Sequence, residues 1–159
     1  MADDDPDDVT VIEVVDPRTP GAREALTQYL AEIVRRGAVR SVAAGEVDNV
    51  DDYTPPGGRF LVVSRGGTVI GCGAVRSMTR DTGEVKRMWI HPEARGAGLG
   101  SRLLDALIAQ SRELGHTTLL LDTSVVLTEA RALYAKHGFE AIEPYNDNPD
   151  ATHFFCKTL

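Results

Sequence analysis

Residues 84–104 read EVKRMWIHPEARGAGLGSRLL, and this stretch decides the fold. It begins like a strand, turns sharply at His91-Pro92, and passes through three glycines in five residues into a helical pattern. Such a loop presents unpaired backbone N–H groups at a helix N-terminus, and the helix dipole adds to their positive potential. Glycine also lets an anion approach the backbone where a Cβ would collide. The stretch therefore predicts an anion cradle that suits a pyrophosphate, and the nearby cations are Lys86, Arg87, Arg95 and Arg102.

Two common phosphate loops do not fit this stretch. A Walker loop requires Gly-Lys-Ser/Thr after four intervening residues, and the sequence lacks it. A Rossmann dinucleotide turn would have its third glycine where Ser101 stands, and residues 91–95 separate the strand from the first glycine. Asp122 follows Gly98 at about the distance of a ribose-binding acid, but the glycine spacing fails. A nucleotide-dependent dehydrogenase is thus a distant alternative.

Outward from this stretch, the chain has an antiparallel first half and a crossover second half. The expected elements of the first half are strands at 9–15, 60–65, 68–78 and 84–90, a helix at 20–36 and a weaker helix within 39–50. Those of the second half are helices at 99–114 and 128–137 and strands at 117–123, 139–142 and 153–157. We expect Thr128 to cap the last helix and Gly138 to stop it. A strand, helix and strand in that order imply parallel pairing of 84–90 with 117–123, so the class is α/β of the α+β type.

Length and charge point to one compact domain. The chain has 159 residues, a size at which about two-thirds of the unfolded surface is buried, and we expect a single domain over 9–159. Five of the seven excess negative charges are aspartates within residues 1–8, which we expect to be a disordered tail. The remaining body lacks the basic field that nucleic acid or anionic lipid requires. No apolar run is long enough for a membrane span and no signal peptide is evident, so a cytoplasmic protein is expected.

The two cysteines, Cys72 and Cys156, are far apart and show neither CxxC nor Cys/His spacing. This excludes a disulfide framework and a zinc site, and we expect both to be small core residues. No arrangement of His, Asp or Glu has metal-ligand spacing, so no metal is expected.

Two motifs resemble the GNAT superfamily of N-acetyltransferases. Residues 95–100, RGAGLG, resemble its Arg/Gln-x-x-Gly-x-Gly pyrophosphate loop, and residues 132–139, ALYAKHGF, resemble its Leu-Tyr-x-x-x-Gly-Phe segment. The resemblance extends over about residues 9–159. It implies the GNAT fold, a mixed and mostly antiparallel sheet with central splayed parallel strands flanked by helices. It also implies that acetyl-coenzyme A lies between those two strands.

The resemblance further implies which residues hold the cofactor. Backbone groups of Met88, Trp89 and Ile90 would bind the pantetheine arm as an added strand. The pyrophosphate would be bound by the loop that begins with the cation Arg95, and the further residues of this loop are Gly96, Ala97, Gly98, Leu99, Gly100 and Ser101. The alternative for these glycines is an ordinary strand-to-helix turn.

The resemblance suggests three catalytic residues. Tyr134 matches the tyrosine that can protonate the departing thiolate, although a core aromatic would also suit its position. Glu84 and Asp122 match the strand glutamates that act as general base in two branches of the superfamily. Their alternatives are a solvated strand end for Glu84 and a turn or cap for Asp122. One departure is Leu127, which stands where many members have a pantetheine-binding Asn.

Two further features concern the acceptor side. Lys86 and Arg87 are neighbours in a strand and should point to opposite faces, so that one of them faces inward, to bind an acidic substrate group or to form a salt bridge. The polar segment 145–150, together with His153 and Phe155, is interpreted either as a lip of the acceptor cleft or as a long hairpin loop.

The expected reaction is transfer of an acetyl group from acetyl-coenzyme A to a primary amine by direct attack in a ternary complex. The acceptor is expected to be a small-molecule amine or a peptide amine, and the chain is expected to act as a monomer or a homodimer. No covalent intermediate is expected, because Cys72 and Cys156 lie outside the motifs. The alternative is an acyl-coenzyme A sensor without turnover.

Overall fold

The computed structural model describes residues 9–38 and 50–159. The acidic segment 1–8 lies outside the described residues, as does all but the last residue of the expected helix within 39–50. The helices are α1 (Pro20–Arg35), α2 (Leu99–Glu113) and α3 (Thr128–Lys136), with 3-10 turns η2 (Val50–Tyr53) and η3 (Pro92–Ala94). The strands are β1 (Thr10–Val15), β2 (Gly58–Arg65), β3 (Thr68–Ser77), β4 (Thr82–Ile90), β5 (Thr118–Thr123), β6 (Glu140–Ile142) and β7 (His153–Thr158).

The strands form one seven-stranded sheet in the order β1-β2-β3-β4-β5-β7-β6. The predicted meander is confirmed, because β2, β3 and β4 pair antiparallel in succession. The predicted parallel pairing of β4 with β5 through the crossover helix α2 is confirmed as well. Every expected strand and helix within the described residues is present, with ends that differ by one or two residues.

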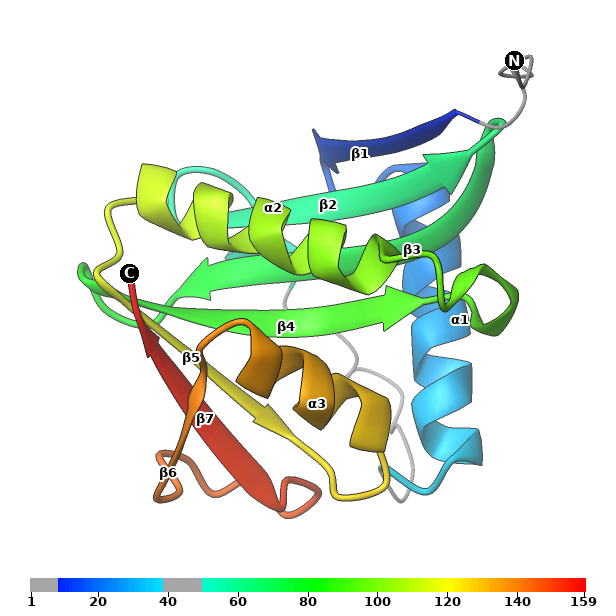
Figure 1. Cartoon of the computed structure of the whole chain (residues 1–159). Coiled ribbons are helices and arrows are strands. Elements are labelled where there is room, and N and C mark those ends of the chain that lie inside the picture. Colours follow the sequence, from blue (N-terminus) through cyan, green and yellow to red (C-terminus); the bar gives the residue numbers. More distant parts are fainter. Residues whose placement is uncertain (1–8, 39–49) are drawn as a thin grey trace, which may run out of the picture.

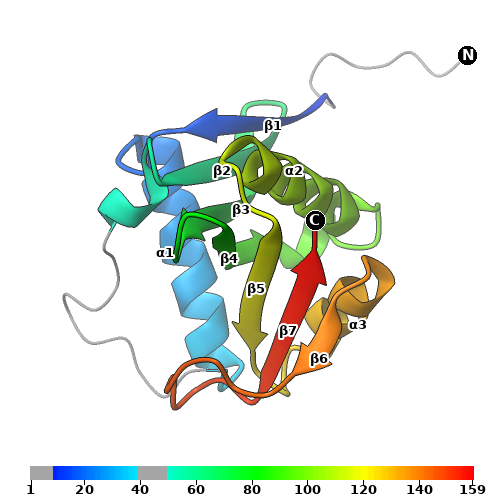
Figure 2. The same cartoon turned by 90° about the vertical axis from the view of Figure 1, so that its left-hand side faces the viewer.

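Helices cover both faces of the sheet. α2 and α3 lie on one face and α1 lies on the other, as Figures 1 and 2 show from two sides. One hydrophobic cluster packs α2 against the sheet and includes Leu103, Leu107 and Leu119. The second packs α1 against the opposite face and includes Ala25 and Phe60. The two clusters hold β4 between them, and this fixes the strand from which the site is built.

The two central strands separate soon after they begin. Within the described residues, β4 and β5 pair only over Thr82–Glu84 with Thr118–Leu120, and beyond this the strands diverge (Figure 1). β5 is paired along its whole length with β7 on its other edge. The second half of β4 therefore has a backbone edge that β5 does not cover.

A bulge in β4 changes the direction of its side chains. The register with β3 shifts between Cys72 and Ala74, and Arg87 has a φ of 57°. This left-handed conformation is uncommon for a residue other than glycine, and a bulge re-aims side chains. Lys86 and Arg87 both belong to the lining of one cavity, and the bulge between Lys86 and Trp89 interrupts the regular alternation on which the prediction of opposite faces depends.

α3 begins one residue earlier than its predicted cap. Leu127 occupies the N-cap position without a side-chain hydrogen bond, and Thr128 is the first residue of the helix. The predicted cap at Thr128 is therefore wrong. Gly138 follows the helix with a φ of 82°, which confirms the predicted stop.

Cys72 is fully buried and Cys156 partly buried, and both are free thiols. Cys72 is therefore the core residue expected, whereas Cys156 lies at the margin of the core. No helix among residues 9–38 and 50–159 combines the length and apolar character needed to cross a membrane.

His116 is buried between α2 and β3 with both ring nitrogens engaged. The hydroxyl of Ser77 lies 2.8 Å from its Nε2, and that of Ser111 lies 2.7 Å from its Nδ1. Removal from water lowers the pKa of the imidazole. The ring packs against Gly83, where a Cβ would stand 2.3 Å from Nδ1.

We expect Gly83→Ala to destabilise the protein by about 2 kcal/mol, because the added methyl displaces a buried, hydrogen-bonded ring. Urea unfolding should show a lower midpoint with an unchanged slope. Gly57→Ala is the matched control, since its Cβ would meet nothing within 4 Å. Equal midpoints for both variants would contradict the close packing of His116.

Candidate active site

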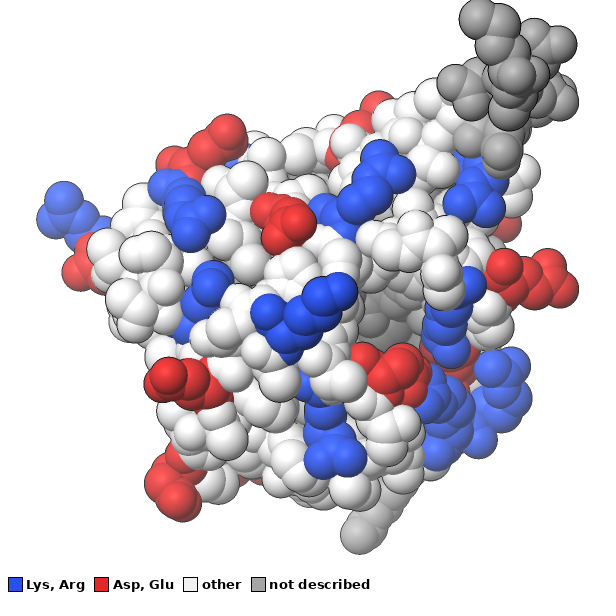
Figure 3. Space-filling model, in the orientation of Figure 1, with Lys and Arg blue, Asp and Glu red and all other residues white. Residues whose placement is uncertain are grey.

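A cavity of about 270 Å³ opens where β4 and β5 separate. Figure 3 shows the hollow in the face that carries α2 and α3, with side chains of both charges at its rim. Nine of the ten expected cofactor residues line it, Ala97 being the exception: Met88, Trp89, Ile90, Arg95, Gly96, Gly98, Leu99, Gly100 and Ser101. The structure therefore brings together the strand and the loop that the sequence placed on the cofactor side.

The glycine loop is shaped to receive an anion. Gly96 and Gly98 have φ values of 89° and 77°, and Gly98 is the N-cap of α2 without a side-chain hydrogen bond. A Cβ on either residue would meet no protein atom within 4 Å, so the space beside the backbone is open. At Gly100 a Cβ would lie 3.2 Å from Leu133 Cδ2. The open N–H groups at the start of this helix fit the diphosphate of coenzyme A.

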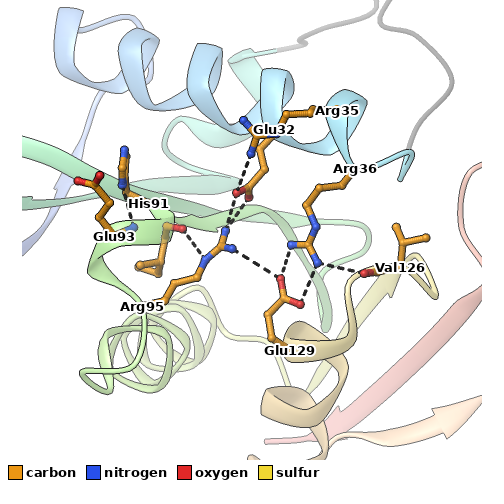
Figure 4. Close-up of polar contacts among 9 residues, drawn as sticks. Glu32, Arg35, Arg36, His91, Glu93, Arg95, Val126 and Glu129 are labelled. Carbon is orange, nitrogen blue, oxygen red and sulfur yellow. Dashed lines mark hydrogen bonds and ion pairs between the residues drawn. The ribbon is translucent and has the colours of Figure 1, made fainter.

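Arg95 ties this loop to two helices. Its guanidinium donates to both carboxylate oxygens of Glu32, at 2.8 and 2.6 Å, and its Nε donates to the carbonyl of Ile90 (Figure 4). Glu129 of α3 lies 4.0 Å from the same guanidinium and is paired with Arg36 at the end of α1. Arg95, which was expected near the cofactor, thus lines the cavity and also connects α1, the glycine loop and α3.

Tyr134 stands where two cavities meet. It lines the first cavity and also a second one, of about 110 Å³, on the side of β5. Its ring packs against Phe139 and Phe155 with centroids 5.9 and 6.0 Å away, and its hydroxyl lies 4.0 Å from Met88 Sδ. Burial raises the pKa of the phenol, so it stays protonated at neutral pH. Tyr134 therefore packs against the core and also lines the cavities, so its two interpretations from the sequence are compatible.

The second cavity is more polar than the first. Its charged lining residues are Lys86 and Arg87 from β4, Asp122 from β5, and Asp150 from the loop before β7. The two cavities share Tyr29, Ile33, Met88, Leu127, Ala130 and Tyr134. They are thus neighbouring parts of one hollow, on the two sides of Tyr134.

Asp122 lines this second cavity from the C-terminal end of β5. One of its oxygens accepts a hydrogen bond from the side-chain amide of Asn146 at 2.7 Å, and the other lies 3.8 Å from Lys86 Nζ. Its side chain is 10% exposed. Because Asp122 lies inside β5, its alternative interpretation as a turn or cap residue is wrong.

Glu84 lies deeper, beside the point where β4 and β5 pair. Its carboxylate is 1% exposed, accepts hydrogen bonds from Arg76 at 2.9 Å and Tyr145 at 2.6 Å, and lies 3.6 Å from Lys86. The alternative of a solvated strand end is therefore wrong. Within the described residues Glu84 lines neither cavity. Burial and the hydrogen bond to Glu84 raise the pKa of Tyr145.

A sequence profile of the acetyltransferase (GNAT) family matches residues 22–139. The chain belongs to this family. It is 37% identical over 138 residues to an IAA acetyltransferase of Azospirillum brasilense, covering 85% of this chain and 90% of that one. Among solved structures, an acyl-CoA N-acyltransferase of Klebsiella pneumoniae superposes with a TM-score of 0.76 at 27% identity, over 95% of this chain and 98% of that one. A GNAT protein of Elizabethkingia anophelis, solved with acetyl-CoA bound, has a TM-score of 0.68 at 20% identity and covers 94% and 98%.

Family membership confirms the predicted GNAT fold and the predicted enzyme class, an acetyltransferase that uses acetyl-coenzyme A. At the GNAT position that often holds an Asn, the structure places Leu127 in the wall shared by both cavities. The side chain there is apolar and forms no hydrogen bond.

Part of the polar segment 145–150 lies beside the second cavity. Asn146 contacts Asp122, and both Asn148 and Asp150 line the second cavity. His153 and Phe155 do not line it within the described residues, and Phe155 packs in the core. Including these two residues in the lip was therefore wrong, because both belong to β7 behind the loop.

The sequence reasoning did not place residues of α1, or its C-cap Arg36, at the site. Tyr29, Glu32, Ile33 and Arg36 all line the first cavity. Their spacing of three and four residues places them on one helical face, and that face carries charges among apolar residues. Glu32 is 6% exposed. A charged residue within an apolar helical stripe is the sequence feature that could have identified this face of α1 as part of a site.

Proposed function

We propose that the protein transfers the acetyl group of acetyl-coenzyme A directly to a primary amine within a ternary complex. One observation carries the proposal: the cavity beside the glycine loop and the polar cavity beside β5 meet at Tyr134. Donor and acceptor can then approach one phenol from opposite sides without either leaving its site.

On the donor side, acetyl-coenzyme A supplies an acyl group activated as a thioester. Residues 96–101 would bind its diphosphate through backbone N–H groups, and the uncovered edge of Met88, Trp89 and Ile90 would hold the pantetheine arm by strand-like hydrogen bonds. Both the diphosphate and the pantetheine arm would therefore be bound by backbone groups rather than by side chains.

Tyr134 would act as the general acid. Its hydroxyl lies beside Met88 in the wall between the cavities. Because the pKa of the phenol is raised, Oη carries a proton at neutral pH, and this proton is present when the thiolate forms. The phenol then donates this proton to the departing sulfur.

Asp122 is our choice for the general base. It lines the acceptor cavity, whereas Glu84 has both carboxylate oxygens engaged outside it. An aliphatic ammonium has a pKa near 10 and must lose a proton before attack. Asp122 would accept this proton, directly or through a water, and its carboxylate lies 3.8 Å from Lys86 Nζ.

We expect Asp122→Asn to lower kcat about 100-fold at pH 7, because an amide cannot accept the proton. The deficit should narrow as the pH approaches 10, where the amine deprotonates without help. Steady-state rates from pH 6 to 10 measure both effects. Asp147→Asn is the control, since Asp147 is an exposed aspartate in the loop before β7. A wild-type pH profile for Asp122→Asn would exclude Asp122 as the base.

The function itself is tested by thiol release from acetyl-coenzyme A over a panel of amines. We expect release with at least one amine, and rates that fit a sequential mechanism. Cys72 and Cys156 line neither cavity, so parallel double-reciprocal lines, which indicate ping-pong transfer, would contradict direct attack. Coenzyme binding with no release across the panel would instead favour the sensor.

A further inference from the structure

His137 joins the first turns of α2 to the end of α3. Its Nε2 lies 3.2 Å from Ser101 Oγ, and its Nδ1 lies 3.2 Å from Asp105 Oδ1. Ser101 and Asp105 are four residues apart in α2 and therefore lie on one face of that helix. His137 is the C-cap residue of α3, and its side chain is 12% exposed. A serine, a histidine and an aspartate thus form a connected chain of polar contacts.

Ser101 connects this chain to the cavity beside the glycine loop. Within the described residues, the lining of that cavity includes Ser101 but not its two partners in the chain. The N–H of Arg102 donates to the carbonyl of Gly98 at 3.1 Å, so the N–H groups of residues 99–101 precede the hydrogen-bonded ladder of α2. The hydroxyl of Ser101 therefore lies beside the backbone groups that we expect to hold the diphosphate, and His137 lies behind it.

Serine, histidine and aspartate also make up a nucleophilic triad, but the place of Ser101 argues against that role. A nucleophile must reach the thioester carbonyl. Ser101 belongs to the first turn of α2, in the proposed diphosphate cradle. In the proposed donor site the thioester lies near Tyr134, where the two cavities meet. The chain of contacts therefore serves binding of the donor rather than a covalent step.

The direction of the Ser101 hydroxyl decides whether it attracts an anion. A serine hydroxyl has one proton to donate and two lone pairs that accept. If it donates to His137 Nε2, it presents lone pairs to the cavity. If it accepts from Nε2–H instead, its own proton is free for a phosphate oxygen. In this second arrangement both ring nitrogens donate, and the carboxylate of Asp105 accepts from Nδ1–H and balances the charge of the ring.

We propose that His137 is a positioning residue for acetyl-coenzyme A. Held by Asp105, it donates from Nε2 to Ser101 and directs the Ser101 hydroxyl to the diphosphate. The proposal rests on the donor site proposed above and adds the two residues behind its loop. Because Tyr134 lies one turn before His137, the same contact joins the loop to the helix of the proposed acid.

The test compares acetyl-coenzyme A with S-acetylpantetheine, a donor that has the same thioester and no diphosphate. The measured quantity is the ratio of kcat/KM for the two donors with one amine. We expect Ser101→Ala and His137→Phe each to lower this ratio about tenfold, the lower end of the range for a hydrogen bond to a charged group. Phenylalanine keeps a ring at residue 137 and removes both polar contacts.

Further variants test the chain of contacts itself. Because His137 acts only through Ser101, the double variant Ser101→Ala/His137→Phe should lower the ratio about tenfold, not about 100-fold. His137→Gln, whose amide can still donate to Ser101, should lose less than His137→Phe. Asp105→Asn should lower the ratio by a smaller factor, because an amide no longer balances the charge of the ring. Glu113→Gln is the matched control, since it removes an exposed carboxylate at the other end of α2, and it should keep the wild-type ratio.

An unchanged ratio in either single variant would overturn the assignment, whether activity is kept or is lost equally with both donors. Additive losses in the double variant would overturn it as well. Calorimetry with coenzyme A repeats the comparison without turnover, and both single variants should raise the Kd about tenfold. Failure of the wild type to acetylate any amine would contradict the proposed function, and the Kd values would still decide the role of His137.

Discussion

Tyr134→Phe is expected to reduce kcat about 100-fold and to leave the Kd of acetyl-coenzyme A unchanged. The phenol lies where the two cavities meet, and removal of a general acid typically costs at least this factor. Turnover is measured by thiol release and the Kd by calorimetry with coenzyme A.

The Tyr134→Phe substitution removes the proton donor and keeps the packing of the ring. Phenylalanine keeps the ring that contacts Phe139 and Phe155, so the melting temperature should stay near that of the wild type. Retained turnover would show that Tyr134 serves only the core and that water protonates the thiolate. A parallel loss of turnover and coenzyme binding would likewise contradict the acid role.

Gly98→Asp is expected to weaken acetyl-coenzyme A binding more than about 100-fold. A Cβ at Gly98 points into open space at the start of α2, so the carboxylate would stand in the anion cradle. Two like charges a few Å apart near a protein surface repel by several kcal/mol. Calorimetry at low and high salt measures the loss, which should shrink as salt screens the repulsion.

Gly98→Asn is the matched control for this variant. Asn and Asp are similar in size, and both tolerate the left-handed backbone at this position better than other residues. We expect the Asn variant to lose about tenfold through steric hindrance alone, and the difference between the two variants reports the charge. Wild-type affinity in Gly98→Asp would place the diphosphate elsewhere and remove the basis of the donor site.

The order of strands and the donor side were predictable because they depend on local patterns. Gly66-Gly67 joins β2 to β3 as a tight turn, and the apolar spacing of residues 99–114 places α2 between two strands that must then be parallel. Three glycines before α2 restrict the loop to few conformations. These features act over a few residues, so the sequence shows them directly.

The acceptor side was harder to predict because it depends on long-range contacts. The bulge at Arg87 follows from how β4 meets β3, whereas the sequence pattern predicted a regular strand through this residue. The burial of Glu84 requires Arg76 from β3 and Tyr145 from a loop 61 residues away. Pairings over such separations leave no periodic signal in the chain.

α1 has a consequence for the order of events during turnover. The same helix supplies Tyr29 and Ile33 to both cavities and, through Glu32, anchors the arginine that precedes the glycine loop. A ligand that shifts the helix from either side alters the fit on the other side, and thermodynamic linkage makes that effect mutual. The affinity for each substrate is therefore expected to change by the same factor when the other substrate is bound.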